Sequence, residues 1–266
     1  IKSSEPNQSP FIMNPYRLLV EEYDPVAKVR GIIAGGEASG GATNVIEYLT
    51  IASTGASNDF GDLTVARMGL GAVGSDVRAV FGGGHSGSSD NTMDYVTIDT
   101  QADADDFGDL SVARHYTVGV SSYIRGVFCG GNTGSNSDVM DYITIATAGG
   151  TANDFGDLQS AKAGMGGVSD KLNNGSTRGV MAGSYAYETT IDYITIATAG
   201  QASDFGELSE ARSTPCGVAS DVRGVFCGGY RGGHGDLDTI DYVTIDTEGT
   251  ANDFGNLIVD NQTQAG

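Results

Sequence analysis

The chain has 266 residues, including 41 glycines and 3 cysteines, and its formal net charge is −20 at pH 7. So acidic a chain is a poor partner for nucleic acids and anionic membrane surfaces. No apolar run approaches the roughly 18 residues of a membrane span, and the odd, widely spaced cysteines predict no disulfide framework. The glycines accompany many Val, Ile, Tyr and Phe residues, which indicates short strands and tight turns rather than a disordered linker.

Residues 1–15, "IKSSEPNQSPFIMNP", match no strand or helix pattern and do not resemble a signal peptide. We expect them to form an N-terminal arm that docks elsewhere or attaches the chain to something larger. We predict that residues 16–266 form a single domain, because the markers of a repeat run through most of this segment.

Five repeat units follow one another along the chain. Their first marker is "RGIIAGG" at residue 30, "RAVFGGG" at 78, "RGVFCGG" at 125, "RGVMAGS" at 178 and "RGVFCGG" at 223. A "DYVTI"-like marker and a "DFGDL"-like marker come next, and an "AR" or "AK" pair then precedes a stretch of small residues. The units cover approximately residues 16–63, 64–110, 111–158, 159–208 and 209–257, and residues 258–266 form a tail or a closing strand.

Each unit contains about four short strand patterns and no helical period. The first pattern is small and apolar, the second ends in Gly-Gly, the third alternates as in "DYITIAT", and the fourth is the short "DFGDL". Four antiparallel strands with a period of 40 to 50 residues are typical of a β-propeller blade. The sequence therefore predicts an all-β fold, a single propeller of five four-stranded blades, with the small-residue strand innermost.

The order of these markers resembles the kelch repeat. A kelch unit has an arginine before its inner strand, a Gly-Gly after its second strand and a tryptophan in its fourth. This chain has no tryptophan, and phenylalanine stands in that place, at Phe60, Phe107, Phe155, Phe205 and Phe254. The units look like a divergent branch, similar to the kelch-like repeats in structural proteins of tailed bacteriophages, particularly marine and cyanobacterial ones.

Two ways of closing the ring remain open. The first unit lacks an "AR" strand and has "PYRLLVEEYDPVAKV" instead, in which Arg17 precedes Arg30 by 13 residues. Either this N-terminal stretch forms the inner strand of the first blade, or the C-terminal tail does. Closure matters because an open ring leaves strand edges that invite pairing with other chains.

The prominent polar residues recur in every unit, whereas a catalytic site needs residues with different roles. We therefore predict no catalytic residues and no cofactor. An aspartate precedes each repeated phenylalanine, and its carboxylate suits a turn in which it accepts a backbone N–H bond two residues later. Calcium is the alternative for these aspartates, which are Asp59, Asp106, Asp154, Asp204 and Asp253.

The recurrent arginines have a structural interpretation. In so acidic a chain we expect them to bond to neighbouring acids or to carbonyl groups between blades. They are Arg30, Arg78, Arg125, Arg178 and Arg223 at one strand start, and Arg67, Arg114 and Arg212 before the inner strands.

The histidines and cysteines suggest no metal chemistry. His85, His115 and His234 look scattered, and the Tyr, His and Cys–Tyr set of kelch-type copper oxidases is not suggested. Cys129 and Cys227 stand at equivalent places in their units and are expected to be small buried residues.

The loop between the second and third strands varies from unit to unit. A constant scaffold with variable loops is how binding surfaces are built, and Tyr, Ser, Asn and Gly are typical of recognition loops. The richest group is Tyr185, Tyr187, Tyr230, Arg231 and His234, which we predict to contact a glycan or a protein patch, with solvated loop tips as the alternative.

The resemblance and the symmetry together favour a non-enzymatic virion protein. We expect a propeller module of a phage appendage or fibre, on the outside of the particle, that presents a binding face to a host-surface glycan or protein. A capsid- or tail-decorating protein, docked on other virion proteins through residues 1–15, is an alternative, and so is a non-viral kelch-type lectin or adaptor. A homo-oligomer on a particle is compatible with the two virion interpretations; nucleic acid and membrane are not expected partners.

Overall fold

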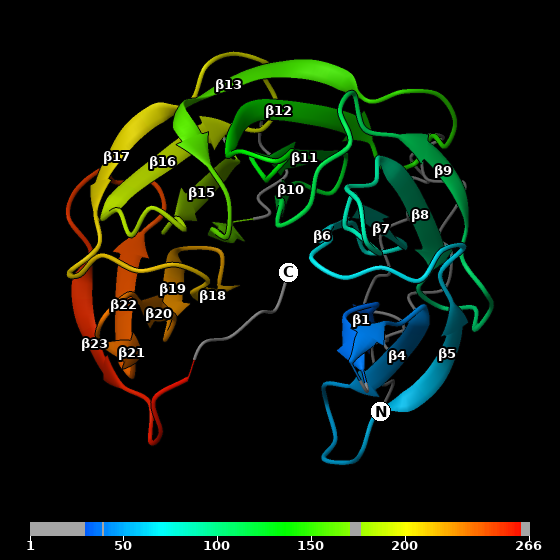
Figure 1. The fold of residues 1–266 in the computed structure, drawn as a ribbon, viewed down its shortest axis with the longest axis horizontal. Helices are drawn as coiled ribbons and strands as arrows, with labels where there is room; N and C mark the ends of the chain where they lie inside the picture. The colour runs from blue at the N-terminus through cyan, green and yellow to red at the C-terminus, as the bar shows by residue number, and fades with distance from the viewer. Residues whose placement is uncertain (1–29, 39, 171–176, 262–266) are drawn as a thin grey trace, which may run out of the picture.

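The computed structural model describes residues 30–38, 40–170 and 177–261, and these form five small β-sheets arranged around a central axis (Figure 1). The predicted all-β fold, a five-bladed propeller, is confirmed. The described residues contain no helix, and so none that could cross a membrane. The predicted N-terminal arm, the proposed strand within residues 16–29 and the last five residues of the tail lie outside the described residues.

Each sheet is antiparallel and uses its strands in chain order. Blade one holds β1 (Arg30–Ala34), β4 (Val45–Thr50) and β5 (Asn58–Asp62). Blade two holds β6 (Gly71–Gly74), β7 (Arg78–Gly82), β8 (Thr92–Thr97) and β9 (Asp105–Asp109). Blade three holds β10 (Val118–Ser121), β11 (Arg125–Cys129), β12 (Ser137–Thr144) and β13 (Asn153–Lys162).

The remaining blades repeat this order. Blade four holds β14 (Gly166–Ser169), β15 (Arg178–Ala182), β16 (Thr190–Thr195) and β17 (Ser203–Glu207). Blade five holds β18 (Cys216–Ala219), β19 (Arg223–Cys227), β22 (Thr239–Thr244) and β23 (Asn252–Asn256). Two short hairpins lie in the loops of blades one and five: β2 (Glu37–Ala38) with β3 (Gly41–Ala42), and β20 (Tyr230–Arg231) with β21 (Gly235–Asp236). Three strands of blade one lie in the described residues, and both stretches proposed for its inner strand fall mostly outside them.

The inner strands β6, β10, β14 and β18 consist of small residues because neighbouring backbones crowd there. A Cβ atom on Gly119 would clash with the carbonyl oxygen of Ala72 in the preceding blade, and one on Gly217 with the carbonyl oxygen of Gly167. Only glycine permits so close an approach.

The "DFG" marker forms a β-bulge in the outermost strand. In blade two, Met93 pairs with Gly108 and Asp94 pairs with Asp106, so Phe107 is the extra residue. The Phe107 ring enters the core between blades two and three, where it packs with Phe128, Ile143 and other buried residues. Equivalent cores lie between blades one and two, three and four, and four and five. Phe107 is therefore a packing residue.

An arginine, a tyrosine and this phenylalanine form a stack in every blade. In blade two, the Arg78 guanidinium lies 4.1 Å from the centre of the Tyr95 ring, and Tyr95 meets Phe107 edge-on at 5.9 Å. Arg78 also donates a 3.0 Å hydrogen bond to the carbonyl of Ile145 in the next blade. The same bond joins Arg30 to Ile98, Arg125 to Ile196 and Arg178 to Ile245. The predicted role of these arginines as links between blades is confirmed for these four.

The cations of the "AR" and "AK" pairs instead form ion pairs with the third strand of a blade. Arg67 lies 2.8 Å from Asp94, and the same pairing joins Arg114 to Asp141, Lys162 to Asp192 and Arg212 to Asp241. These eight side chains are almost completely buried. The three arginines stand on the connections that lead into the inner strands, whereas Lys162 ends β13 of blade three, so its pair with Asp192 of β16 links two blades.

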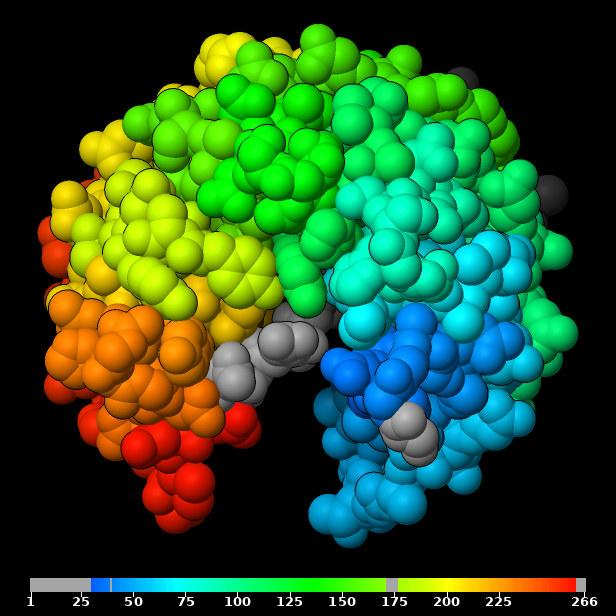
Figure 2. Space-filling view, in the orientation of Figure 1, coloured from blue at the N-terminus to red at the C-terminus, as the bar shows by residue number. Residues whose placement is uncertain are grey.

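The ring is open in the described residues. Figure 1 shows a gap between blade one and blade five, and the space-filling view shows a notch there (Figure 2). The face of blade five toward this gap carries Phe254, which is 53% exposed, whereas its equivalent Phe205 is 2% exposed. Cys227 is correspondingly only half-buried while Cys129 is fully buried, so the prediction for the cysteines holds at one position of the two.

Candidate binding site on the loop face

One end of the propeller carries the variable loops. In each blade the turn from the first to the second strand lies at one end, and the loop from the second to the third strand lies at the other, because the strands alternate in direction. The connection from the fourth strand to the next inner strand also lies at this second end. We call this end the loop face.

Four residues with left-handed backbone conformations are linked by hydrogen bonds across the loop face. They stand two residues after the buried cations: Gly69 (φ 66°), Tyr116 (φ 54°), Gly164 (φ 68°) and Thr214 (φ 51°). The Tyr116 amide donates to the Gly69 carbonyl, the Gly164 amide to the Tyr116 carbonyl at 3.2 Å, and the Thr214 amide to the Gly164 carbonyl at 2.8 Å. Glycine suits this conformation, whereas a tyrosine there carries strain on the order of 1 kcal/mol.

Tyr116 is the centre of an aromatic cluster from three blades. Its ring lies 4.8 Å from His115, 5.2 Å from Tyr185 and 6.0 Å from His85, and the two histidine rings are 4.6 Å apart. The backbone builds this cluster, because the residue before each left-handed position forms a β-bridge or backbone hydrogen bond with the residue after the Gly-Gly turn. Met68 bridges to His85 and His115 bridges to Asn132, while the Tyr185 amide donates to the carbonyl of Ala163.

The tyrosine rings of the loop face lie over glycines. A Cβ atom on Gly69 would come within 2.9 Å of the Tyr116 ring, one on Gly164 within 2.9 Å of the Tyr185 ring, and one on Gly232 within 2.9 Å of the Tyr187 ring. Any other residue at these glycines would push a tyrosine out of place. The glycines therefore hold the rings at fixed positions along the face.

Burial favours the neutral form of His115 in this cluster. Partial burial lowers the pKa of His115, and the neighbouring His85 lowers it further. The Nδ1 atom of His115 lies 3.0 Å from the hydroxyl of Ser89, which fixes the ring. Burial raises the pKa of Tyr185, with a further contribution from Tyr116. His115 and Tyr185 are thus biased toward their uncharged forms.

The predicted site residues fall into one neighbourhood, with one exception. Tyr187 lies 6.1 Å from Tyr230 between ring centres, and Tyr185 joins this pair to the Tyr116 cluster. Arg231 makes a long 3.7 Å ion pair with Glu210 and remains partly exposed. His234 lies at the exposed tip of the β20–β21 hairpin and makes none of the ring contacts of the other four. The binding prediction for these residues stays a prediction.

Three residues of the cluster were missed by the sequence reasoning. His85 and His115 looked scattered because they are 30 positions apart, and the register of two neighbouring blades brings them together. The signal lies in an alignment of the units on their buried cations. Tyr116 then takes the place of Gly69, Gly164 and Thr214, and an aromatic residue where its equivalents are small marks an unusual site.

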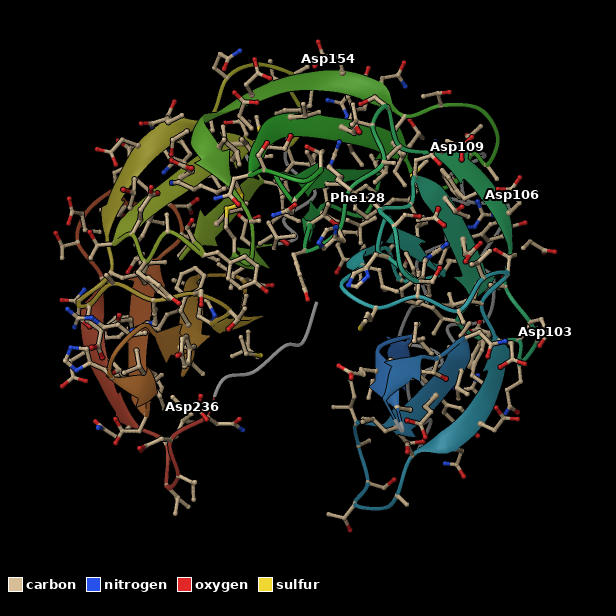
Figure 3. All side chains as sticks on the ribbon, in the orientation of Figure 1. Asp103, Asp106, Asp109, Phe128, Asp154 and Asp236 are labelled. Atoms are coloured by element: carbon tan, nitrogen blue, oxygen red, sulfur yellow. The ribbon has the colours of Figure 1, made fainter. Side chains whose placement is uncertain are left out.

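The repeated aspartates are turn residues. The carboxylate of Asp106 accepts a 2.9 Å hydrogen bond from the amide of Gly108, and the same bond recurs at Asp154, Asp204 and Asp253. Figure 3 shows Asp106 and Asp154 on the outer rim, in different blades. Within the described ranges, no three His, Cys, Asp or Glu side chains converge in a way that could hold a metal ion. The predicted turn role is confirmed at these four positions.

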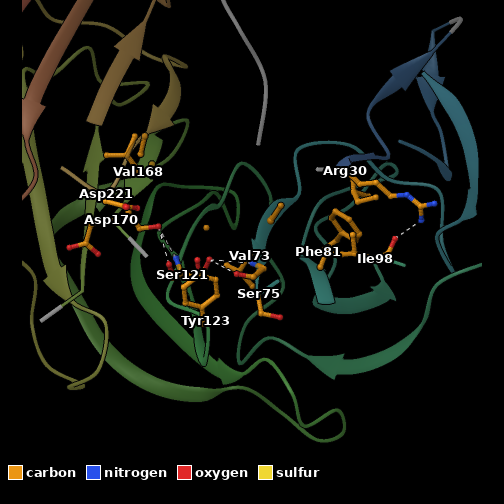
Figure 4. Close-up of a pocket in the computed structure, with 18 of the residues that line it drawn as sticks. Arg30, Val73, Ser75, Phe81, Ile98, Ser121, Tyr123, Val168, Asp170 and Asp221 are labelled. Atoms are coloured by element: carbon orange, nitrogen blue, oxygen red, sulfur yellow. Dashed lines mark hydrogen bonds between the residues drawn. The ribbon is translucent and has the colours of Figure 1, made fainter. Parts of the chain in front are cut away.

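A cavity of about 490 Å³ opens at the other end of the axis (Figure 4). The inner strands and their turns line it, with Ser75, Ser121, Tyr123, Asp170 and Asp221 among the polar side chains. The hydroxyl of Ser121 already bonds to the carbonyl of Gly74, and that of Ser169 to the carbonyl of Ser121. The serines therefore serve to link neighbouring inner strands, and the aromatic face offers the more distinctive chemistry.

No protein-family model matches the chain, and no curated protein matches it either.

Proposed function

We propose that the chain is a non-enzymatic binding module, a propeller of a phage appendage or fibre whose loop face binds a glycan on the host surface. The observation that carries the proposal is the strained Tyr116 at the centre of an aromatic row. His85, His115 and Tyr116 begin this row, and Tyr185, Tyr187 and Tyr230 continue it toward blade five. Strain persists where the surrounding structure maintains it, and such positions cluster at ligand sites.

The chemistry of the row favours a neutral sugar. Tyrosine supplies a rigid contact surface with a polar tip, and rings held on glycine lose little freedom when a ligand binds. The lowered pKa of His115 favours its neutral form, and the chain is strongly acidic, so a sialylated or sulfated glycan is disfavoured. A row of rings from successive blades suits several sugar units in a line rather than a single one.

The viral setting rests on the sequence. The repeat resembles kelch-like units of tailed-phage structural proteins, and residues 1–15 match no repeat marker, which is why we propose that they dock on another virion protein. The two alternatives, a particle-decorating protein and a non-viral lectin, would use the same loop face. They are distinguished by whether the chain is found on virus particles. Labelled electron micrographs of intact particles test the virion part, and deletion of residues 1–15 tests attachment through the arm.

Glycan binding is tested with Tyr116→Gly on a neutral-glycan array. Glycine stands at the equivalent positions 69 and 164, so the variant keeps the fold and we expect its melting temperature to be unchanged or higher. We expect binding to fall at least tenfold. The matched control is Tyr123→Ala, since Tyr123 is an exposed tyrosine at the opposite end of the axis. Equal binding by the parent and Tyr116→Gly, or binding of no glycan by the parent, contradicts the proposal.

A further inference from the structure

Blade five keeps the residues of an interior blade on a face that none of residues 30–38, 40–170 and 177–261 covers. The phenylalanines Phe60, Phe107, Phe155 and Phe205 are each 2 to 3% exposed because the following blade packs on them. Phe254 has the same neighbours in its own blade, including Tyr242 edge-on at 5.9 Å, yet it is 53% exposed. Val218 of the inner strand is also exposed, whereas the equivalent Val168 is buried.

The backbone of the outer strands shows the same difference: β17 of blade four is in contact with the next blade, and β23 of blade five is not, within the described residues. The carbonyl of Phe205 accepts a 2.6 Å bond from the amide of Gly249 in the next blade, and the carbonyl of Glu207 accepts one from Ala251. A Cβ atom on Gly206 would clash with the carbonyl oxygen of Gly249, so glycine is required there. At the equivalent Gly255 a Cβ atom would meet nothing within 4 Å of it.

The inter-blade arginine of blade five also lacks its usual acceptor among the described residues. Arg178 donates to the carbonyl of Ile245 at 3.4 Å, as the arginines of the three preceding blades do to theirs. Arg223 stacks on Tyr242 at 4.3 Å in the same way. No following blade offers it a carbonyl within the described ranges.

Blade one, on the other side of the gap, also exposes apolar residues whose equivalents in the other blades are buried. Phe81, Phe128, Met181 and Phe226 are buried against the preceding blade, whereas their equivalent Ile33 in blade one is 51% exposed. Ile51 is 66% exposed, and its equivalent Ile145 is fully buried. The notch in Figure 2 therefore has two apolar walls of the kind that pair at each of the four blade interfaces.

Asn261 stands where the connection to a new blade begins. In blade two, for comparison, the Gly84 amide donates a hydrogen bond to the carbonyl of Arg114, and the Arg114 amide donates one to the carbonyl of Asp90. In blade five the Gly229 amide donates to the carbonyl of Asn261 at 2.9 Å, and the Asn261 amide donates to Leu237 at 3.0 Å. The backbone of Asn261 thus repeats the contacts of the residue that leads into the next inner strand.

We propose that the exposed face of blade five binds one further four-stranded blade of the same repeat. Such a sheet supplies what the face lacks: a glycine-rich turn whose amides reach the Phe254 carbonyl, a carbonyl for Arg223 and apolar side chains over Phe254. Residues 1–29 contain no glycine and none of the repeat markers, so they supply no glycine-rich turn. The first blade of a second copy offers three strands within the described residues, whereas the blades that pack on one another elsewhere in the ring have four.

The test extends the chain by one unit. A copy of residues 163–212 is joined after Asn261, in place of residues 262–266; this unit contains no cysteine. The readout is the reaction of Cys227, on the exposed face, with a thiol reagent, followed by peptide mass, and the buried Cys129 serves as internal reference. We expect Cys227 to react at least tenfold more slowly in the extended chain, and hydrogen exchange of β23 to slow to the rate of β17.

The control is the same extension with Met181→Asp in the appended copy, because a charge on the docking face of that copy opposes burial. We expect this control to react like the parent. The proposal is overturned if the extension leaves Cys227 and β23 as accessible as before. It is also overturned if Cys227 and β23 are already protected in the parent. Protection at all concentrations would show that the parent's own chain covers the face. Protection only at high concentration would show that a second copy covers it.

Discussion

Arg67 and Asp94 form a 2.8 Å ion pair in which both side chains are completely shielded from solvent. Burial lowers the pKa of Arg67, although the neighbouring carboxylates counteract this, so the pair is held together at a desolvation cost. Removal of one partner leaves a buried charge without compensation. We expect Asp94→Ala to lower the free energy of unfolding by about 3 to 5 kcal/mol, measured by denaturant unfolding.

The matched control for this pair is the half-exposed pair of Arg231 and Glu210, whose charged atoms are 3.7 Å apart. Glu210→Ala should cost no more than about 1 kcal/mol, because water screens such pairs. The double replacement Arg67→Met with Asp94→Leu should recover much of the loss. A similar cost for Asp94→Ala and Glu210→Ala would contradict the importance of burial.

The two phenylalanines Phe205 and Phe254 separate packing between blades from packing within a blade. Each meets a tyrosine of its own blade edge-on, at 5.8 and 5.9 Å, and only Phe205 is covered by another blade. Phe205→Ala should cost about 3 to 5 kcal/mol, and Phe254→Ala in the unextended chain less than about 1 kcal/mol. Equal losses in melting temperature would show that the two faces are equally covered in solution.

Gly206 and Gly255 provide a second matched pair, in the backbone. Both have φ in the left-handed region, at 143° and 132°, so alanine strains the two sites alike. Only at Gly206 does the new methyl group clash with the next blade. Gly206→Ala should therefore be the more destabilising by about 1 to 3 kcal/mol, and a difference near zero in denaturant midpoints would argue against close contact at Gly206.

The histidine cluster predicts a pH dependence of stability. The pKa of His115 is lowered below its ordinary 6.5, so the unfolded chain binds more protons than the folded one as the pH falls through 6.5. The contribution of His115 to stability is therefore present above pH 6.5 and is lost toward the lowered folded pKa. Melting temperatures between pH 8 and 5 should fall less steeply in His115→Ala than in the parent.

The control for the pH series is His234→Ala, because His234 is exposed on a hairpin tip and has no histidine neighbour. It should keep the parental slope. Carboxylates such as Asp192 titrate in the parent and in both variants. Their contribution to the pH dependence of the melting temperature is therefore the same in all three proteins. Identical slopes for His115→Ala and the parent would contradict the lowered pKa.

The repeat allowed the architecture to be predicted from the sequence. Because the units are so similar, the sequence did not show where contacts between blades differ. Five copies of the markers predicted the blades and the turn role of Asp106, because each arises from a local pattern. The meeting of His85 with His115 depends on how two blades are staggered around the axis, which no single unit encodes. The exposure of Phe254 likewise depends on whether another blade packs on blade five, since its local sequence matches that of Phe205.

The left-handed positions near the axis are held by backbone hydrogen bonds alone, through the amides of Tyr116, Gly164 and Thr214. The Tyr116 side chain therefore carries no part of this hydrogen-bonded scaffold, whereas a side chain on Gly164 would meet the Tyr185 ring. Under the proposed function, Tyr116 is thus the position of the row where a single exchange changes the aromatic surface while the blades stay the same.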